Sequence, residues 1–146
     1  MKSQRFGIEI EMTGLTRRSA ALIIAKHFDT GFRHERGVYD TYSVCDQDGR
    51  KWKIVRDASI TPQCGNRFDY DPDYKVEVVS PICHYEDIET IQSIVRELRR
   101  NGHAKVNESC GIHIHVDASK HTARSLRNIA TVSYTHLRAH ETVLDL

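Results

Sequence analysis

The sequence has no long apolar segment, no leader-like start and no excess of charge of either sign. Its longest apolar run, residues 20–25, is far shorter than the roughly 20 residues that a membrane-spanning helix needs. Residues 1–5 lead directly into a strand-like segment, without the apolar core of a signal peptide. The formal net charge of +1 gives no electrostatic case for binding to nucleic acid or to a membrane surface. We therefore expect a cytoplasmic protein that binds neither.

Closely spaced cysteine pairs are absent as well. The four cysteines are separated by 19, 19 and 27 positions, so the chain has no C-x-x-C motif of the zinc-knuckle or thioredoxin kind. Without a secretory signal, we expect free thiols at all of them. The 146 residues are 39% hydrophobic and 28% charged, which is typical of one folded domain and excludes a disordered chain or a coiled coil. The cysteines are Cys45, Cys64, Cys83 and Cys110.

The last fifteen residues, 132–146, resemble a translated sequencing adapter. Residues 132–142 read V-S-Y-T-H-L-R-A-H-E-T, which is one reading frame of a transposase-type adapter. The alternative is a genuine helix that carries two histidines and a glutamate. We expect residues 132–146 to be an artefactual tail and residues 1–131 to be the N-terminal part of a longer domain.

Alternation of apolar and polar residues predicts a sheet. Phe6, Ile8, Ile10 and Met12 fall on one face of a strand over residues 5–12, because side chains alternate along a strand. An Asp-Gly turn separates two further strand-like runs and predicts a hairpin. The expected strands are residues 5–12, 38–45, 52–56, 74–79 and 111–117, with loops around residues 31–37 and over residues 61–73.

Helices are predicted between these strands. Thr16 can cap a helix over residues 17–28, and an apolar stripe indicates a second helix over residues 85–100 that Gly102 ends. A third helix begins at Ser119 or Thr122. Hairpins with segregated helices indicate an α+β fold with a mainly antiparallel sheet.

On their polar faces, two of the predicted strands carry side chains of the types that bind metal ions. Glu9 and Glu11 project from the same face about 6.6 Å apart, a spacing that suits carboxylates serving neighbouring metal ions. His113 and His115 do the same from a later strand. A solvated polar face is the alternative for each pair taken alone.

Other residues point to the same chemistry. Asp57 and Ser59 follow the hairpin, where a carboxylate and a hydroxyl could line a cleft. Glu77 lies between two valines and needs a partner if it faces inward, because burying a bare carboxylate is costly. Gly7 and Gly111 each precede the first candidate ligand of their strand by two residues, where a missing side chain would let a ligand approach closely.

In this order, the motifs resemble those of the amidoligase family, the glutamine-synthetase-like carboxylate–amine ligases. The segment N-E-S-C-G-I-H-I-H at residues 107–115 is similar to the Asn-Gly-Ser-Gly-x-His-x-His segment of glutamine synthetase, with Glu108 and Cys110 departing from it. The other matching segments are F-G-I-E-I-E at 6–11, R-D-A-S-I at 56–60 and V-E-V-V-S-P at 76–81.

The resemblance implies an ATP-dependent enzyme that joins a small-molecule or peptide carboxylate to an amine through an acyl phosphate. It implies a glutamine-synthetase-like catalytic sheet with helices on one face, and an oligomer is compatible with it. His115 would contact the nucleotide, and Asp57, with Ser59 as a lesser candidate, would orient the amine or take its proton. The implied ligands for Mg²⁺ or Mn²⁺ are Glu9, Glu11, Glu77 and His113.

The resemblance also implies later strands, beyond residue 131, that carry phosphate-binding arginines and a further glutamate. We therefore expect residues 1–131 to be the N-terminal part of an amidoligase-like catalytic domain, a fragment with little ligase activity and an unfinished sheet edge. Two alternatives stay open. One is a zinc-dependent hydrolase that uses His113, His115, Glu9 and Glu11. The other is a non-catalytic remnant that binds metal or nucleotide.

Overall fold

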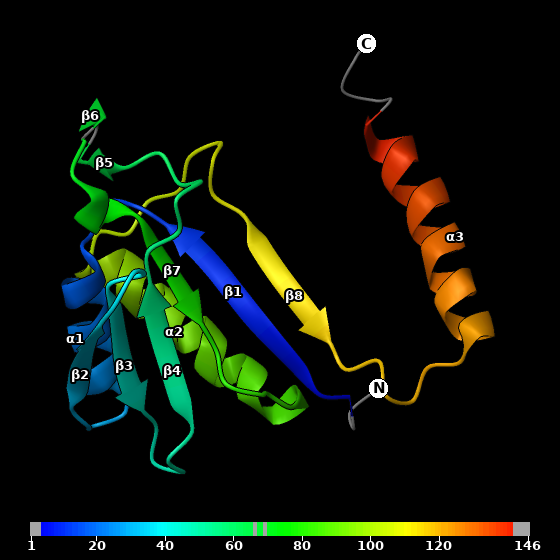
Figure 1. Ribbon diagram of the computed structural model, residues 1–146, viewed down its shortest axis with the longest axis horizontal. Helices are drawn as coiled ribbons and strands as arrows, with labels where there is room; N and C mark the ends of the chain where they lie inside the picture. Colours follow the sequence, from blue (N-terminus) through cyan, green and yellow to red (C-terminus); the bar gives the residue numbers. More distant parts are fainter. Residues whose placement is uncertain (1–3, 66, 69, 142–146) are drawn as a thin grey trace. The chain divides into compact units, whose positions relative to one another are not determined.

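A six-stranded antiparallel sheet is the centre of the computed structural model, which describes residues 4–65, 67–68 and 70–141 (Figure 1). The strand order is β2-β3-β4-β7-β1-β8, and each neighbouring pair is antiparallel. This confirms the predicted α+β fold with an antiparallel sheet. The strands are β1 (Phe6–Met12), β2 (Phe32–Arg36), β3 (Thr41–Cys45), β4 (Lys51–Val55), β7 (Val76–Val79) and β8 (Ile112–Val116).

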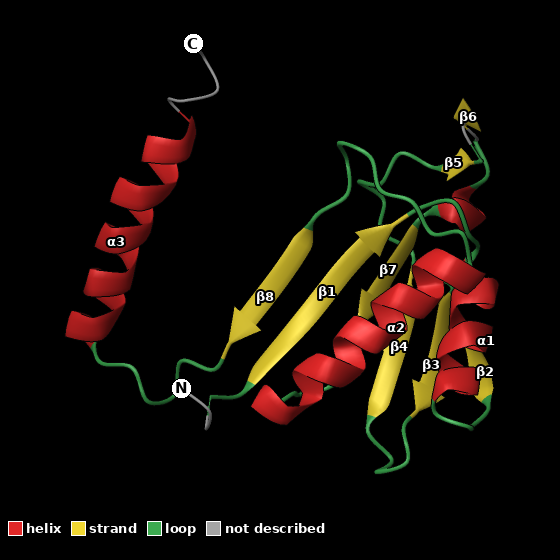
Figure 2. Cartoon of the chain, turned by 180° about the vertical axis from the view of Figure 1, so that it is seen from behind, coloured by secondary structure: helices red, strands yellow, loops and turns green. Residues whose placement is uncertain are grey.

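Two helices, α1 (Arg17–His27) and α2 (Ile88–Asn101), cover one face of this sheet (Figure 2). Thr16 caps α1, because its side chain accepts a hydrogen bond from the backbone N–H of Ser19 (3.2 Å). Gly102 follows α2, and its N–H donates to the carbonyl of Leu98 (3.0 Å). Both ends agree with the sequence predictions.

The hydrophobic core lies between the helices and the sheet. Ile24 of α1 and Leu98 of α2 are almost completely buried there. Val76 and Val78 of β7 are buried on this side, so the intervening Glu77 projects from the other face. The alternation therefore gives the sheet an apolar, helix-covered face and a second face that carries the acidic residues.

The predicted loop around residues 31–37 is wrong, because β2 pairs there with β3. Only Phe32 of β2 is apolar and partly buried, and the residues after it are charged or polar and exposed. Such a strand at the edge of a sheet has no apolar alternation for a sequence pattern to detect. The remaining elements are β5 (Gln63–Cys64), β6 (Arg67–Phe68) and two 3₁₀ turns, η1 (Pro72–Tyr74) and η2 (Tyr85–Asp87).

Residues 117–146 form a second unit, separate from residues 1–116. Its helix α3 (Ala123–Glu141) begins after Thr122, whose side chain accepts a hydrogen bond from the N–H of Ser125 (3.2 Å). The predicted boundary of the adapter-like tail, between residues 131 and 132, falls within this helix, and residues 142–146 lie outside the described residues. The tail therefore stays a prediction.

Two further expectations concern the whole chain. All four cysteines are free thiols, as predicted. In the part of the chain that the structure describes, no helix has both the length and the apolar character that crossing a membrane would require.

Candidate functional site

Carboxylates from three segments converge on the face of the sheet opposite the helices. Glu11 of β1 is the register partner of Glu77 of β7. Val55, near the end of β4, also pairs with Glu77, so the chain that leaves β4 carries Asp57 to the same place. One carboxylate oxygen each of Glu11, Asp57 and Glu77 lies within 4.8 Å of the other two. The structure thus brings together three carboxylates that lie far apart in the sequence.

The two histidines approach this cluster from β8. His113 is the register partner of Glu9, and His115 is the partner of Gly7. The imidazole of His113 lies 3.6 Å from a Glu9 oxygen through Nδ1 and 3.7 Å from a Glu11 oxygen through Nε2. His115 Nε2 lies 3.1 Å from the same Glu9 oxygen. All seven side chains predicted from the sequence therefore lie on or beside one face of the sheet, with Ser59 hydrogen-bonded to Asp57.

Glu11 is the most deeply buried carboxylate of the cluster, and it is held by the chain that enters β8. Its residue exposure is 5%, and its Oε2 accepts a hydrogen bond from the N–H of Gly111 (2.7 Å). A Cβ at position 111 would lie 3.3 Å from His113 Nε2 and 3.5 Å from this Glu11 oxygen. Glycine at position 111 therefore avoids close contacts with a carboxylate and an imidazole, while the close approach of a ligand there stays a prediction. Gly7 is less restricted, since a Cβ there would meet only His115 Cβ at 4.0 Å.

Asp57 is oriented by Ser59. The backbone N–H and the hydroxyl of Ser59 both donate to Asp57 Oδ1 at 2.6 Å. These hydrogen bonds stabilise the ionised form, and they hold the pKa of Asp57 below its usual value. Since both bonds use the same oxygen, Ser59 fixes the direction of the carboxylate.

A pair of loop contacts that sequence reasoning missed joins the two sides of the site. Ser109 Oγ accepts a hydrogen bond from the N–H of Thr61 (2.8 Å), and Asn107 Nδ2 donates to the carbonyl of Thr61 (2.9 Å). The turn before β8 is thus attached to the loop that carries Asp57. No local pattern could reveal these contacts, because their partners are 46 and 48 positions apart.

The cluster concentrates negative charge. Partial burial, and then the neighbouring carboxylates of Glu9, Asp57 and Glu11, raise the pKa of Glu77 to about 7. The ion-pair partners that the structure gives Glu9 and Glu11 are imidazoles. Hard carboxylate oxygens with one or two imidazoles are a donor set that fits Mg²⁺ or Mn²⁺.

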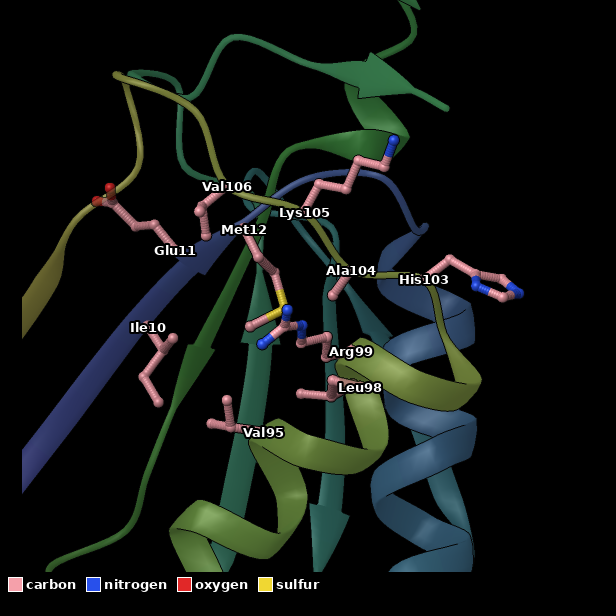
Figure 3. Close-up of a pocket in the computed structure, with 10 residues that line it drawn as sticks. All are labelled: Ile10, Glu11, Met12, Val95, Leu98, Arg99, His103, Ala104, Lys105 and Val106. Carbon is pink, nitrogen blue, oxygen red and sulfur yellow. The ribbon is translucent and has the colours of Figure 1, made fainter. Parts of the chain in front are cut away.

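A groove of about 720 Å³ lies on the other face of β1, beside α2 (Figure 3). Figure 3 shows the carboxylate of Glu11 turned away from the other lining side chains. The groove therefore adjoins the carboxylate cluster at Glu11, and the rest of its floor is largely apolar. Its apolar lining comprises Ile10, Met12, Val95, Leu98, Ala104 and Val106.

Comparison of the chain with models of known protein families identifies its family. The sequence model of a protein family described as "Putative amidoligase enzyme" matches residues 2–144. No curated protein and no solved structure matches the chain. The matched range contains every carboxylate and histidine of the cluster.

Proposed function

Because this chain belongs to the amidoligase family, we propose that it is an ATP-dependent carboxylate–amine ligase. In this reaction a substrate carboxylate oxygen attacks the γ-phosphorus of ATP, which gives an acyl phosphate and ADP. An amine then attacks the acyl carbon, phosphate leaves, and one proton is released as the amide forms. The observation that carries the proposal is the carboxylate–imidazole cluster on the open face of β1, β7 and β8.

We propose that the cluster holds Mg²⁺ or Mn²⁺. When bound, such ions neutralise phosphate charge during phosphoryl transfer. Glu11 is suited to a fixed ligand position, because the Gly111 N–H already orients its carboxylate. Glu9 lies between the imidazoles of His113 and His115, and the same carboxylate oxygen contacts both. The proposed ligands are Glu9, Glu11, Asp57, Glu77 and His113.

Asp57 is better suited to binding a cation than to taking a proton from the amine. The hydrogen bonds from Ser59 lower its pKa, so its carboxylate is a weaker proton acceptor than an ordinary aspartate. Its oxygen also lies with those of Glu11 and Glu77. We therefore assign Asp57 to the ligand set and Ser59 to its orientation, in place of the amine-directed role that the family resemblance implies.

His115 is an exposed residue of the site. Its side chain is 64% exposed, and its Nε2 lies 3.1 Å from a Glu9 oxygen. This position leaves the imidazole accessible to an anionic ligand above the cluster. We propose that it donates a hydrogen bond to a phosphate group of the nucleotide.

The test is amine-dependent release of ADP. With Mg²⁺, ATP and panels of carboxylates and amines, ADP should form only when both organic substrates are present, and an amide should form with it, at the low rate expected if residues 1–131 are only the N-terminal part of the domain. Glu11→Gln keeps the side-chain volume but removes one charge, and it should abolish this release. Glu89→Gln, on an exposed position of α2, is the matched control and should not change it.

A metal-dependent hydrolase is the second candidate, and the proximity of His113 and His115 to Glu9 favours it. Two imidazoles and a carboxylate are a common zinc donor set. Bond cleavage with Zn²⁺ in the absence of ATP would support the hydrolase and contradict the ligase.

A further inference from the structure

Among the proposed metal ligands, Asp57 alone lies outside the strands of the sheet. Because β4 ends at Val55, Asp57 belongs to no strand in the part of the chain that the structure describes, and ladder hydrogen bonds do not fix its backbone. Ser59 orients the carboxylate, but it belongs to the same short segment and does not attach that segment to the sheet. A metal ligand must be held to within about 0.5 Å of its working position. The contacts of the loop after β4 therefore determine how well Asp57 can serve.

This loop is held at Thr61 by two side chains of the turn before β8. Ser109 Oγ accepts a hydrogen bond from the N–H of Thr61 (2.8 Å), and Asn107 Nδ2 donates to the carbonyl of Thr61 (2.9 Å). Ser109 Oγ also donates to Asn107 Oδ1 (2.6 Å), which closes a ring of three hydrogen bonds. Both backbone polar groups of Thr61 are thus bound. We call the contacts of Thr61 with Asn107 and Ser109 the Thr61 clasp.

The turn that supplies the clasp is itself attached beside β1 at both of its ends. Before the turn, Lys105 and Thr13 exchange backbone hydrogen bonds of 2.8 and 2.9 Å. After the turn, the carbonyl of Gly111 accepts from the N–H of Glu11 (3.0 Å), and the N–H of Gly111 donates to the Glu11 carboxylate (2.7 Å). The clasp therefore joins the loop that carries Asp57 to the strand that carries Glu11.

We propose that Asn107 and Ser109 are positioning residues, which act through Thr61 to hold Asp57 in place relative to Glu11. This role rests on the proposed function, because it concerns the metal site proposed above. Thr61 is only four positions from Asp57, and the side chain of Ile60 between them is completely buried. A shift of Thr61 is therefore passed along a short, anchored segment to the Asp57 carboxylate.

A second attachment keeps the loop on the sheet when the clasp is lost. The hydroxyl of Thr13, a residue with 0% exposure, accepts a hydrogen bond from the N–H of Gln63 (2.7 Å). The N–H of Gly14 donates to the carbonyl of Gln63 (3.0 Å). Removing the clasp should therefore loosen the segment that carries Asp57 without releasing the whole loop. A change in ligand position can then be told apart from a loss of folding.

The first test is the affinity of the full chain for Mn²⁺ alone, measured by electron paramagnetic resonance from the signal of the free ion. Ser109→Ala should weaken binding about tenfold, the lower end of the effects seen when partners of metal ligands are removed. Asn107→Ala removes the other contact to Thr61 and should weaken binding as well. Ser109→Thr keeps the hydroxyl and should bind as the wild-type chain does. Val106→Ala, at an exposed position next to the turn, is the matched control and should also bind normally.

The second test is a double variant, which shows whether the clasp acts through Asp57. Asp57→Asn should weaken binding of Mn²⁺, because it removes a proposed ligand. If Ser109 acts by positioning Asp57, adding Ser109→Ala to the Asp57→Asn chain should change its affinity by less than about twofold. A general loosening of the protein would instead produce the same loss in both backgrounds. Far-ultraviolet circular dichroism of all these chains should match that of the wild type.

The outcomes separate the role of the clasp from the proposed function. Wild-type affinity in both Ser109→Ala and Asn107→Ala would overturn the positioning role and leave the metal site in place. An undiminished effect of Ser109→Ala in the Asp57→Asn background would also overturn it, because the clasp would then act on another part of the site. Unfolding of both single variants would assign the clasp to folding instead. A wild-type chain that binds no Mn²⁺ would contradict the proposed metal site itself, and the role of the clasp with it.

Discussion

Two groups of carboxylates in this molecule differ in the source of the positive charge that balances them. In the first, the guanidinium of Arg17, which is 3% exposed, donates hydrogen bonds to Asp40 Oδ2 (2.6 Å) and Asp73 Oδ1 (2.8 Å). It also donates to the backbone carbonyl of Lys75 (3.1 Å). This group is balanced by a cation that is part of the chain.

In the second group, Glu9, Glu11, Asp57 and Glu77 face one another, and the ion-pair partners that the structure gives Glu9 and Glu11 are imidazoles. The pKa shifts in the two groups have opposite directions. Hydrogen bonds from Arg17 lower the pKa of Asp40, whereas burial and neighbouring carboxylates raise the pKa of Glu77.

The difference distinguishes a group with an internal counterion from the group that we propose as a metal site. An internal guanidinium satisfies its carboxylates permanently and ties the start of α1 to distant loops. Carboxylates that repel one another destabilise the ionised, folded protein unless a cation arrives from solution. The second group therefore has the electrostatic character of a site for an external cation.

The largest loss of stability is expected when the internal cation of the first group is removed. Arg17→Met should lower the free energy of unfolding by about 3 kcal/mol, because it removes a buried guanidinium that donates to two carboxylates and two backbone carbonyls. Urea denaturation monitored by circular dichroism measures this change. Arg18→Met, at the next and exposed position of α1, should change stability by no more than about 1 kcal/mol, the size of an exposed contact between its guanidinium and the Phe32 ring. Equal effects of the two substitutions would show that the Arg17 network is not important for stability.

A smaller effect should follow from adding the divalent cation that we propose for the second group. Mg²⁺ or Mn²⁺ at a concentration 100 times its Kd should stabilise the protein by about 2.7 kcal/mol, because it binds the folded state. Thermal unfolding with and without the ion measures this gain. Glu11→Gln can still accept the hydrogen bond from Gly111 but should lose most of the gain, and Glu89→Gln should keep it. An equal gain in the Glu11 variant would place ion binding elsewhere.

The sequence predicted which side chains share a face more reliably than which side chains touch. Alternation in β1, β7 and β8 follows from the backbone geometry, so Glu9 and Glu11 could be assigned to one face without a structure. The pairing of Glu11 with Glu77 depends on sheet order, which local patterns do not encode. The resemblance to a known family supplied the grouping of these residues, and the family model confirms the family itself.

Contacts between distant loops account for what the sequence could not predict. Asp57 reaches Glu77 only because β4 pairs with β7. Thr61 joins the turn before β8 through hydrogen bonds to Asn107 and Ser109, and nothing in the composition of either loop indicates this. The residues could therefore be named in advance, while the change in the proposed role of Asp57 required the geometry.

The smallest predicted effect is the pH dependence of stability that Glu77 causes. Because the pKa of Glu77 is about 7 in the folded state and near its ordinary value of 4.5 in the unfolded state, the unfolded chain loses its proton first as pH rises. This carboxyl therefore costs no stability below about pH 4.5, its cost grows between about pH 4.5 and 7, and the cost is constant above that range. Glu77→Gln removes the cost, so in the absence of metal the variant should gain stability relative to wild type across this window.

The measurement is urea denaturation of both proteins from pH 4 to pH 8 in the presence of a chelator. The difference between them, rather than either curve, isolates Glu77 from the other titrating groups. Glu89→Gln should show no such pH-dependent difference, because its carboxylate lies outside the cluster. Adding Mg²⁺ should reverse the order at pH 8, since the ion favours the ionised carboxylate that glutamine cannot provide. Parallel curves for wild type and Glu77→Gln would mean that the carboxylates do not repel one another in the folded protein, and the contrast between the two groups would then disappear.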